Sequence, residues 1–172
     1  IFSGVFDGNG YTVKHLFINR KYHGTTGWIN VGLFSYNKGI IENLGMVESS
    51  ITASCNVGIW SGGIAGNNVG TIQNCYNTGS VLSDSNATSY VGGITGHNEG
   101  MVIQCHNSGH IDSNVSTRSS NIVSASGGIA GYNFNVVTDC YNLGEISSSA
   151  EYSESYAGGI VGIHMQGSID DC

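Results

Sequence analysis

Six histidines are the first residues in the sequence that could bind a metal, and they lie at positions 15, 23, 97, 106, 110 and 164. A zinc-protease helix needs the HExxH spacing, which puts two imidazoles on one face, and the sequence lacks that motif. His106 and His110 are four residues apart, but Gly109 lies between them. We therefore expect surface or corner histidines, and we predict no metal site and no cofactor.

Cysteines provide a second candidate chemistry. Four of them occupy one repeated position, which two earlier copies fill with leucine: Cys75, Cys105, Cys140 and Cys172, preceded by Leu16 and Leu44. A position that accepts Leu or Cys is a core position, where a free thiol behaves as a small hydrophobic group. In-register coils would also bring the alpha carbons within reach of a disulfide. We expect buried free thiols, and Cys55 lies outside this register.

Aspartates gather beside the cysteine position, at Asp139, Asp170 and Asp171. Solenoid enzymes that act on acidic polysaccharides use aspartates and calcium, so a calcium or catalytic pair of Asp139 and Asp171 is one alternative. In other copies the same position holds Asn43, Asn74 and Gln104. Because no acidic pair repeats, a hydrated edge is the expected role, and we assign no catalytic residue.

An aromatic row follows the cysteine position in three copies, as Tyr76, His106 and Tyr141. These rings should face outward if the cysteines face inward, since strand side chains alternate. Such a row could stack on sugar rings or on a partner's side chains, and the alternative is packing between coils. It is our first candidate binding site.

A second candidate is a serine-rich edge whose length varies between copies. It comprises residues 83–89, 113–126 and 147–156, and the last segment carries Tyr152 and Tyr156. Insertions in repeat proteins gather on one face, which is often the binding face. If the chain binds a partner, we favour this variable edge over the aromatic row.

These candidates are positioned by a repeat. Residues 62–81 read GGIAGNNVGTIQNCYNTGSV, and similar segments begin at residues 92 and 127, with a weaker one at 31 and a truncated one near the end. The aligned glycines are Gly32, Gly63, Gly93, Gly128 and Gly159, which are 31, 30, 35 and 31 residues apart. Such periods indicate a solenoid or a propeller. The glycine content argues against helical repeats, and about 30 residues is too short for a four-stranded propeller blade.

The apolar pattern predicts how each coil bends. Each copy has two apolar positions three residues apart, for example Ile72 and Cys75. Three is the wrong parity for one straight strand, so a bend should separate them. Glycine and asparagine are expected to form the corners through positive φ. Asparagines in two registers should bond from coil to coil as ladders: Asn37, Asn68, Asn98 and Asn133 with His164, and Asn77, Asn107 and Asn142.

The predicted fold is therefore all-β, a parallel β-solenoid of about five to six coils, with right-handed coiling expected for parallel crossovers. We read residues 1–172 as one repeat domain cut from a longer array. It would comprise a partial coil at 1–30, repeats at 31–61, 62–91, 92–126 and 127–157, and a truncated repeat at 158–172. Its open ends should contact flanking repeats of the same chain or associate end to end.

Charge limits the partners. The net charge is −7, from 12 acidic and 5 basic residues. Without a basic patch to neutralise phosphates, nucleic-acid binding is not expected. No apolar run reaches the 18 or so residues of a membrane span. Proline is absent, which agrees with strands that are paired on both sides.

The motifs GIAG, GITG, GIAG and GIVG, which begin at Gly63, Gly93, Gly128 and Gly159, resemble the GLUG repeat family. That resemblance covers residues 31–172 and implies extracellular or surface-anchored bacterial proteins of adhesin type, and also the non-catalytic part of some immunoglobulin A metallopeptidases. We expect a structural or adhesive module without catalytic activity, whose partners are host or cell-surface glycans or proteins. The alternatives are a polysaccharide-active β-helix enzyme, a carbohydrate-binding module, or an accessory region of a secreted peptidase.

Overall fold

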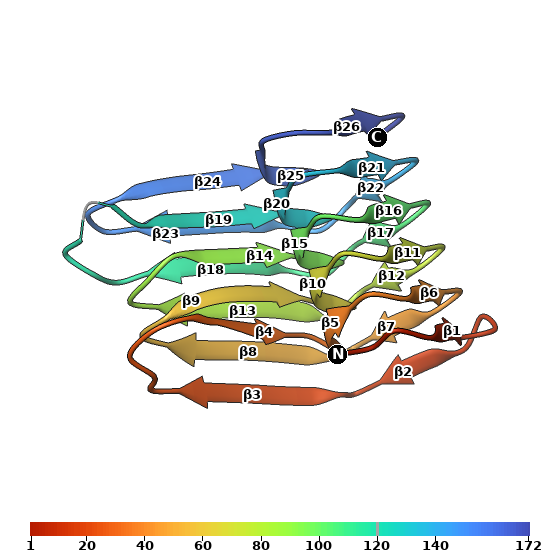
Figure 1. Cartoon of the computed structure of the whole chain (residues 1–172), viewed down its shortest axis with the longest axis horizontal. Helices are drawn as coiled ribbons and strands as arrows, with labels where there is room; N and C mark the ends of the chain where they lie inside the picture. Colours follow the sequence, from red (N-terminus) through yellow and green to blue (C-terminus); the bar gives the residue numbers. More distant parts are fainter. Residues whose placement is uncertain (120) are drawn as a thin grey trace.

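The computed structural model describes residues 1–119 and 121–172 and confirms a parallel β-solenoid of about five turns (Figure 1). Each turn contributes one strand to each of five parallel sheets, which we number I to V in the order in which the chain visits them. Every strand pairs with the strand one turn earlier or later. The repeat period seen in the sequence is therefore the period of the coil.

Sheets I and II are built from short strands. Sheet I contains β1 (Val5–Asp7), β6 (Ile40–Glu42), β11 (Thr71–Gln73), β16 (Met101–Ile103), β21 (Val136–Thr138) and β26 (Ser168–Asp170). Sheet II contains β2 (Thr12–Lys14), β7 (Gly45–Val47), β12 (Tyr76–Asn77), β17 (His106–Asn107) and β22 (Tyr141–Asn142). Together they form one narrow end of the coil, on the right of Figure 1.

Sheets III and IV form the opposite end. Sheet III contains β3 (Phe17–Tyr22), β8 (Ser50–Cys55), β13 (Ser80–Ser85), β18 (Ile111–Val115) and β23 (Ile146–Ala150). Sheet IV contains β4 (Trp28–Val31), β9 (Gly58–Gly62), β14 (Ser89–Gly92), β19 (Val123–Gly127) and β24 (Glu154–Gly158). Figure 1 shows these two sheets extending side by side to the left.

Sheet V connects the two ends. It contains β5 (Phe34–Asn37), β10 (Ala65–Asn68), β15 (Thr95–Asn98), β20 (Ala130–Asn133) and β25 (Val161–His164). It contacts sheet IV closely, because β15 lies against β9 of the preceding coil as well as pairing with β10. The interior of the solenoid is filled by columns of isoleucine and valine, which are fully buried in the middle coils.

The predicted bend between the paired apolar positions is confirmed. Ile72 and Cys75 are both buried, and Asn74 between them has a φ of 49°. The equivalent residues in the other coils have the same left-handed conformation: Asn43, Gln104, Asp139 and Asp171, with φ of 55°, 52°, 53° and 52°. Asn and Asp tolerate this conformation better than most other residues. The bend turns the chain from sheet I into sheet II and lets both apolar side chains face inward.

Both asparagine ladders are also confirmed. Asn68 Nδ2 donates to Asn98 Oδ1 at 2.9 Å, and its own Oδ1 accepts from Asn37 Nδ2 at 2.8 Å. Asn133 Nδ2 lies 3.1 Å from His164 Nδ1 at the end of this first ladder. In the second ladder Asn77 Nδ2 donates to Asn107 Oδ1 at 2.9 Å. Each asparagine side chain hydrogen-bonds to its counterpart in the adjacent coil, so these buried amides are not left without partners.

The expected role of the repeat glycines is wrong. Of all the glycines, only Gly10, Gly27 and Gly167 have a φ between +20° and +160°. The repeat glycines are instead required by close approach. A β-carbon on Gly93 would collide with the Gly128 carbonyl oxygen and with Asn107 Cγ. Glycine in that register therefore makes room for the second asparagine ladder and for the next coil.

A polar interior separates sheets III and IV. Six serine hydroxyls form one hydrogen-bonded chain that crosses between the two sheets and climbs through three coils, in the order Ser83, Ser89, Ser113, Ser124, Ser148 and Ser155, with Oγ to Oγ distances of 2.8 to 3.0 Å. In the coil below, Ala53 and Ile59 take these positions. A hydroxyl both donates and accepts, so the chain can satisfy the buried serines without water.

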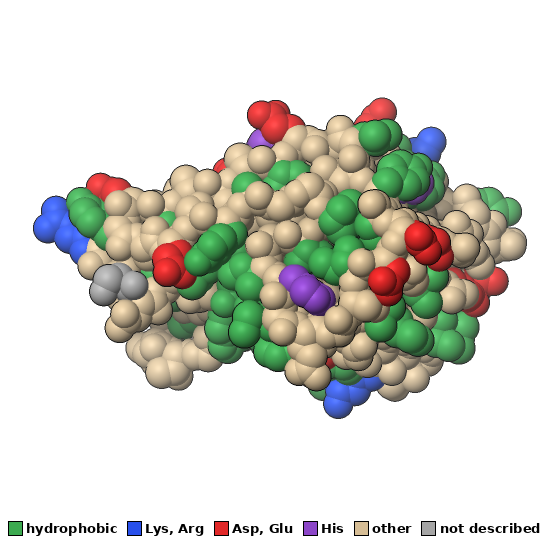
Figure 2. All heavy atoms as spheres, turned by 90° about the horizontal axis from the view of Figure 1, so that it is seen from above, with side chains coloured by type: hydrophobic (Ala, Val, Ile, Leu, Met, Phe, Trp, Pro, Cys, Tyr) green, Lys and Arg blue, Asp and Glu red, His purple; other side chains and the backbone are tan. Residues whose placement is uncertain are grey.

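The end coils expose side chains that the middle coils bury. Ile169 is 38% exposed, whereas Val137, its partner in the preceding coil, is fully buried. Seen from above in Figure 2, this end of the molecule shows mainly hydrophobic and uncharged polar groups, with acidic side chains scattered over it and basic side chains only at its periphery. The described residues include no helix long and apolar enough to span a membrane.

The first ladder can be tested by replacing Asn68 with alanine. The change leaves the Asn37 amide and the Asn98 oxygen without their partner, at about 1–3 kcal/mol for each buried group. We expect the free energy of unfolding in urea to fall by about 3 kcal/mol. Asn114, which bonds to Asp84 at an exposed site, is the control, and Asn114→Ala should change stability by less than about 0.5 kcal/mol. Equal effects of the two changes would contradict a structural role for the ladder.

The close-approach role of glycine can be tested within one register. Gly93→Ala should lower the free energy of unfolding by about 3 kcal/mol, because the new methyl group meets backbone that cannot move away. Gly159 is the matched control, since a β-carbon there meets nothing within 4 Å. Gly159→Ala should leave stability unchanged or raise it slightly. Urea denaturation of both variants measures these changes. Similar destabilisation by the two substitutions would show that glycine is needed in this register for its backbone conformation and not for close approach.

Candidate functional site

The predicted aromatic row exists on sheet II as a stack of rings. Tyr76 and His106 lie 5.0 Å apart with planes 6° from parallel, and His106 and Tyr141 lie 4.7 Å apart at 2°. Tyr76 also covers Gly45 in the coil below, where a β-carbon would collide with its ring. The faces of Tyr76 and His106 are therefore used for packing between coils. A sugar ring approaching the row would meet ring edges and the outer face of Tyr141, which is 48% exposed.

The variable edge is the turn from sheet III to sheet IV. Most of its residues belong to strands, and the connecting turns are residues 86–88, 116–122 and 151–153, of which Ser120 lies outside the described residues. Tyr152 lies in the last of these turns and is 48% exposed. Tyr156 lies in β24, where it faces outward from sheet IV. The structure therefore places the two tyrosines in different settings, a turn and a sheet face.

A larger group of aromatic side chains lies where sheets IV and V meet. Sheet V approaches closely because a glycine repeats there, and a β-carbon on Gly96 would meet the Trp60 carbonyl carbon at 2.7 Å. We call the group the aromatic cluster: Trp28, Trp60, Tyr90, His97, Tyr132 and Phe134. Two of the stacked pairs join a residue of sheet IV to the residue of sheet V one coil later, whereas Trp28 and Trp60 stack on each other within sheet IV at 4.7 Å. Trp60 stacks on His97 at 4.4 Å, and Tyr90 stacks on Tyr132 at 4.7 Å.

Burial in the cluster keeps its titratable groups neutral. His97 is only 5% exposed, and burial lowers the pKa of its imidazole despite Glu99 at 3.5 Å. Burial also raises the pKa of Tyr90 to about 12. At neutral pH the cluster therefore presents uncharged rings.

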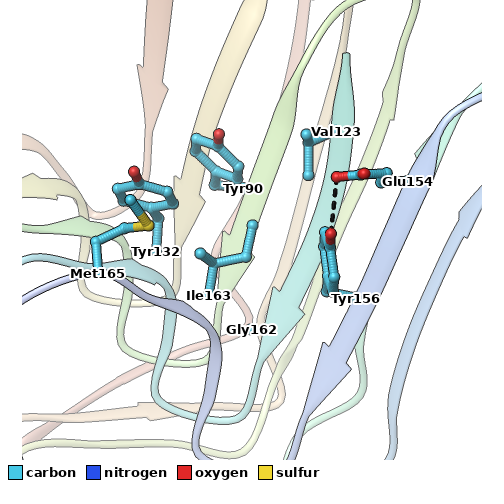
Figure 3. A pocket seen from close by; sticks show the side chains of 8 residues that line it. All are labelled: Tyr90, Val123, Tyr132, Glu154, Tyr156, Gly162, Ile163 and Met165. Carbon is cyan, nitrogen blue, oxygen red and sulfur yellow. Dashed lines mark hydrogen bonds between the residues drawn. The ribbon is translucent and has the colours of Figure 1, made fainter. Parts of the chain in front are cut away.

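A pocket of about 400 Å³ opens at the end of the aromatic cluster (Figure 3). Its lining residues are Tyr90, Val123, Tyr132, Glu154, Tyr156, Gly162, Ile163 and Met165. Tyr156 donates its hydroxyl to Glu154 Oε2 at 2.7 Å, and this bond raises the pKa of the Tyr156 phenol. Figure 3 shows Tyr90 and Tyr132 on one side of Ile163 and the Tyr156–Glu154 pair on the other.

Sequence reasoning identified one pocket residue, Tyr156, and missed the others. The available signal was the position three residues before the second repeat glycine, which holds Trp60, Tyr90 and Tyr156. His97 and Tyr132 share another register, and the prediction of a surface or corner histidine is wrong for His97, which is buried against Trp60. The sequence does not show that the sheet IV row and the sheet V row lie against each other, because periodicity does not reveal that sheet V packs on sheet IV. The row of Tyr76, His106 and Tyr141 belongs to sheet II and does not contribute to this pocket.

The cysteines and the candidate carboxylates lie in different settings, the core and an exposed bend. Cys75, Cys105 and Cys140 are buried as predicted, and burial raises the pKa of the Cys105 thiol well above its usual value. Asp139 and Asp171 lie at the exposed bend of adjacent coils. Among residues 1–119 and 121–172, no three His, Cys, Asp or Glu side chains lie close enough together to bind a metal ion.

Comparisons with known proteins give one partial similarity. A segment of 86 residues, 49% of this chain, is 38% identical to halomucin of Haloquadratum walsbyi. The matched segment spans only 1% of the length of halomucin, so the similarity lies within a far longer protein. No family model matches the chain. No solved structure matches it either.

Thiol accessibility tests the inward register of the cysteines. In the native state we expect rapid labelling of Cys172, the one cysteine that is exposed, and slow labelling of the buried Cys55, Cys75, Cys105 and Cys140. All five should react in denaturant. Titration with a chromogenic disulfide, with and without guanidinium, gives both counts. Rapid native labelling of Cys105 would show that this register does not face the core.

Proposed function

We propose that the chain is a structural and adhesive repeat module of a secreted or surface-anchored protein of the bacterial type that the GLUG resemblance implies. The observation that carries the structural part is the continuity of the hydrogen-bonded columns. The first asparagine ladder runs from Asn37 to His164, and the serine chain runs from Ser83 to Ser155. Each coil is fixed in register by the coil before it, which suits a stiff spacer that lengthens by adding coils.

Two further observations support placing the module in a long extracellular chain. The matched segment of halomucin is a small part of a far longer protein. The sequence is rich in Ser, Thr, Asn and Gly and carries a net charge of −7, which favours solubility and disfavours binding to acidic surfaces. Neither observation depends on a catalytic group.

The adhesive part of the proposal is supported by the aromatic cluster and its pocket. Trp28, Tyr156 and Met165 are 45%, 41% and 59% exposed although they lie on a rigid parallel sheet framework. Exposed aromatic side chains held in fixed positions are typical of binding surfaces, because little side-chain entropy is lost when a partner contacts them. The proposal assigns no catalytic step to this chain.

Protease treatment of intact cells tests the surface location. Cells of the source organism would be treated briefly with a protease, and the released peptides identified by mass spectrometry. We expect peptides that contain residues 116–119 or 151–153, which lie in turns at the variable edge, to be among them, while a cytosolic marker enzyme stays intact. Recovery of the chain only after lysis would overturn the proposal.

The rival enzymatic reading has its own test. A polysaccharide-active solenoid enzyme would cleave uronate polymers, with or without calcium, and would depend on Asp139 and Asp171. We expect the purified chain to release no reducing ends from such polymers. Cleavage that is abolished by Asp139→Asn would replace the structural proposal with the enzymatic one.

A further inference from the structure

The pocket arises where the ring stacking between sheets IV and V stops. Two of the stacked pairs follow the same rule, in which a sheet IV residue of one coil meets a sheet V residue of the next. Trp60 meets His97, and Tyr90 meets Tyr132. The next pair by this rule is Ala125 and Ile163, which stand in register after Tyr90 and Tyr132. An aliphatic pair takes the place of a ring pair, and the pocket opens at this level.

Aromatic rings remain on both sides of that level. Tyr132 is the last ring of the stack, and Tyr156 stands in the coil beyond Ala125. Neighbouring coils are about 4.8 Å apart, so the backbones of Tyr90 and Tyr156, which are two coils apart, are separated by about 9.6 Å. The ring of Tyr132 fills part of the space between the two tyrosines. Ile163, Val123 and Met165 complete the apolar lining. The volume of about 400 Å³ lies in the lower part of the range for small-ligand pockets.

The polar groups of the pocket sit at the rims of its apolar surfaces. Tyr90, Tyr132 and Tyr156 each carry a hydroxyl at the edge of the ring, and Glu154 adds a carboxylate beside Tyr156. Apolar faces combined with hydroxyl and carboxylate groups match a sugar ring, which has apolar C–H faces and hydroxyls around its edge. None of the eight lining residues is Lys or Arg. An anionic sugar would therefore meet Glu154 without a compensating cation.

A quaternary ammonium ligand fits this geometry less well. Such a cation is recognised by several ring faces turned toward one point. Here Tyr90 stacks on Trp28 at 5.7 Å and on Tyr132 at 4.7 Å, so both of its faces are covered. Tyr132 also stacks on two rings, Tyr90 and His97 at 5.5 Å, which leaves Tyr156 as the lining tyrosine without a stacked partner among the described residues. One such face is too few to enclose a cation, but it suits a flat sugar ring lying against it.

We propose that the pocket lined by Tyr132, Tyr156 and Glu154 binds one pyranose ring of a neutral glycan. The sugar ring packs against the face of Tyr156 and the edge of Tyr132, and the Glu154 carboxylate accepts hydrogen bonds from its hydroxyls. This proposal rests on the adhesive part of the proposed function and gives it a ligand class. It is independent of the structural part, because a spacer module needs no ligand in this pocket.

Binding can be measured by isothermal titration of the purified chain with neutral oligosaccharides. The probes are hexamers of β-glucose, α-mannose, galactose and N-acetylglucosamine, with oligogalacturonate and choline chloride as competing ligand classes. We expect saturable binding of at least one neutral hexamer. Tyr156→Ala should weaken it about tenfold, the change that about 1.4 kcal/mol of lost contact free energy produces. Glu154→Gln should also weaken it while leaving the ring surfaces intact.

Two matched controls locate the site. Tyr141→Ala removes an equally exposed tyrosine from the row on sheet II, and Tyr11→Ala removes one that is 74% exposed near the first coil. Both should bind like the parent chain, and circular dichroism should show the same fold for all variants. Loss of binding in Tyr141→Ala but not in Tyr156→Ala would move the site to sheet II and overturn the proposal. Binding of only choline or oligogalacturonate, or of none of the probes, would also overturn it, and protease release from intact cells would still stand as support for the surface module.

Discussion

The structure depends on one constraint, the stacking of each coil in register on the one before it. Coils about 4.8 Å apart turn every repeat position into a column, so each side chain has its own counterparts as neighbours above and below. Inward polar groups bond along or across these columns: the asparagine amides bond to their own copies in adjacent coils, whereas the serine hydroxyls bond alternately across sheets III and IV. Asparagine amides and serine hydroxyls both donate and accept, and they are the polar groups that the interior uses. A column of lysine or glutamate would place like charges at the same spacing.

The same constraint explains which parts of the fold could be predicted. The bend between Ile72 and Cys75 followed from strand parity, and the ladders of Asn68 and Asn107 followed from columns of one residue type. These are properties of a single column, which the sequence displays directly. The inward position of Cys105 was predicted for the same reason, since Leu44 and the cysteines share its column. The assignment of Leu16 to that column is wrong, because the next residue, Phe17, pairs with Ser50.

What the sequence did not reveal depends on how different columns meet. Glycine at Gly93 appeared to be needed for a corner, but its lack of a β-carbon is what matters, because Asn107 and the next coil press against it. The stacking of Trp60 on His97 joins two columns on different sheets and different coils. Neither contact leaves a periodic signal of its own. The angle at which two sheets meet is set by packing in three dimensions, so the candidate site was found only in part, through Tyr156.

The outward columns of sheets IV and V show that the fold itself does not require their aromatic residues. The sheet IV column runs Asn30, Trp60, Tyr90, Ala125 and Tyr156, and the sheet V column runs Tyr36, Asn67, His97, Tyr132 and Ile163. Polar, aliphatic and aromatic side chains all occur at these positions without altering strand pairing, whereas the inward column of sheet I holds only isoleucine and valine from Ile41 to Ile169. The rings therefore contribute packing on an outer surface that would form without them. Their concentration around a single aliphatic gap is better explained by a ligand that fills that gap than by the needs of the coil.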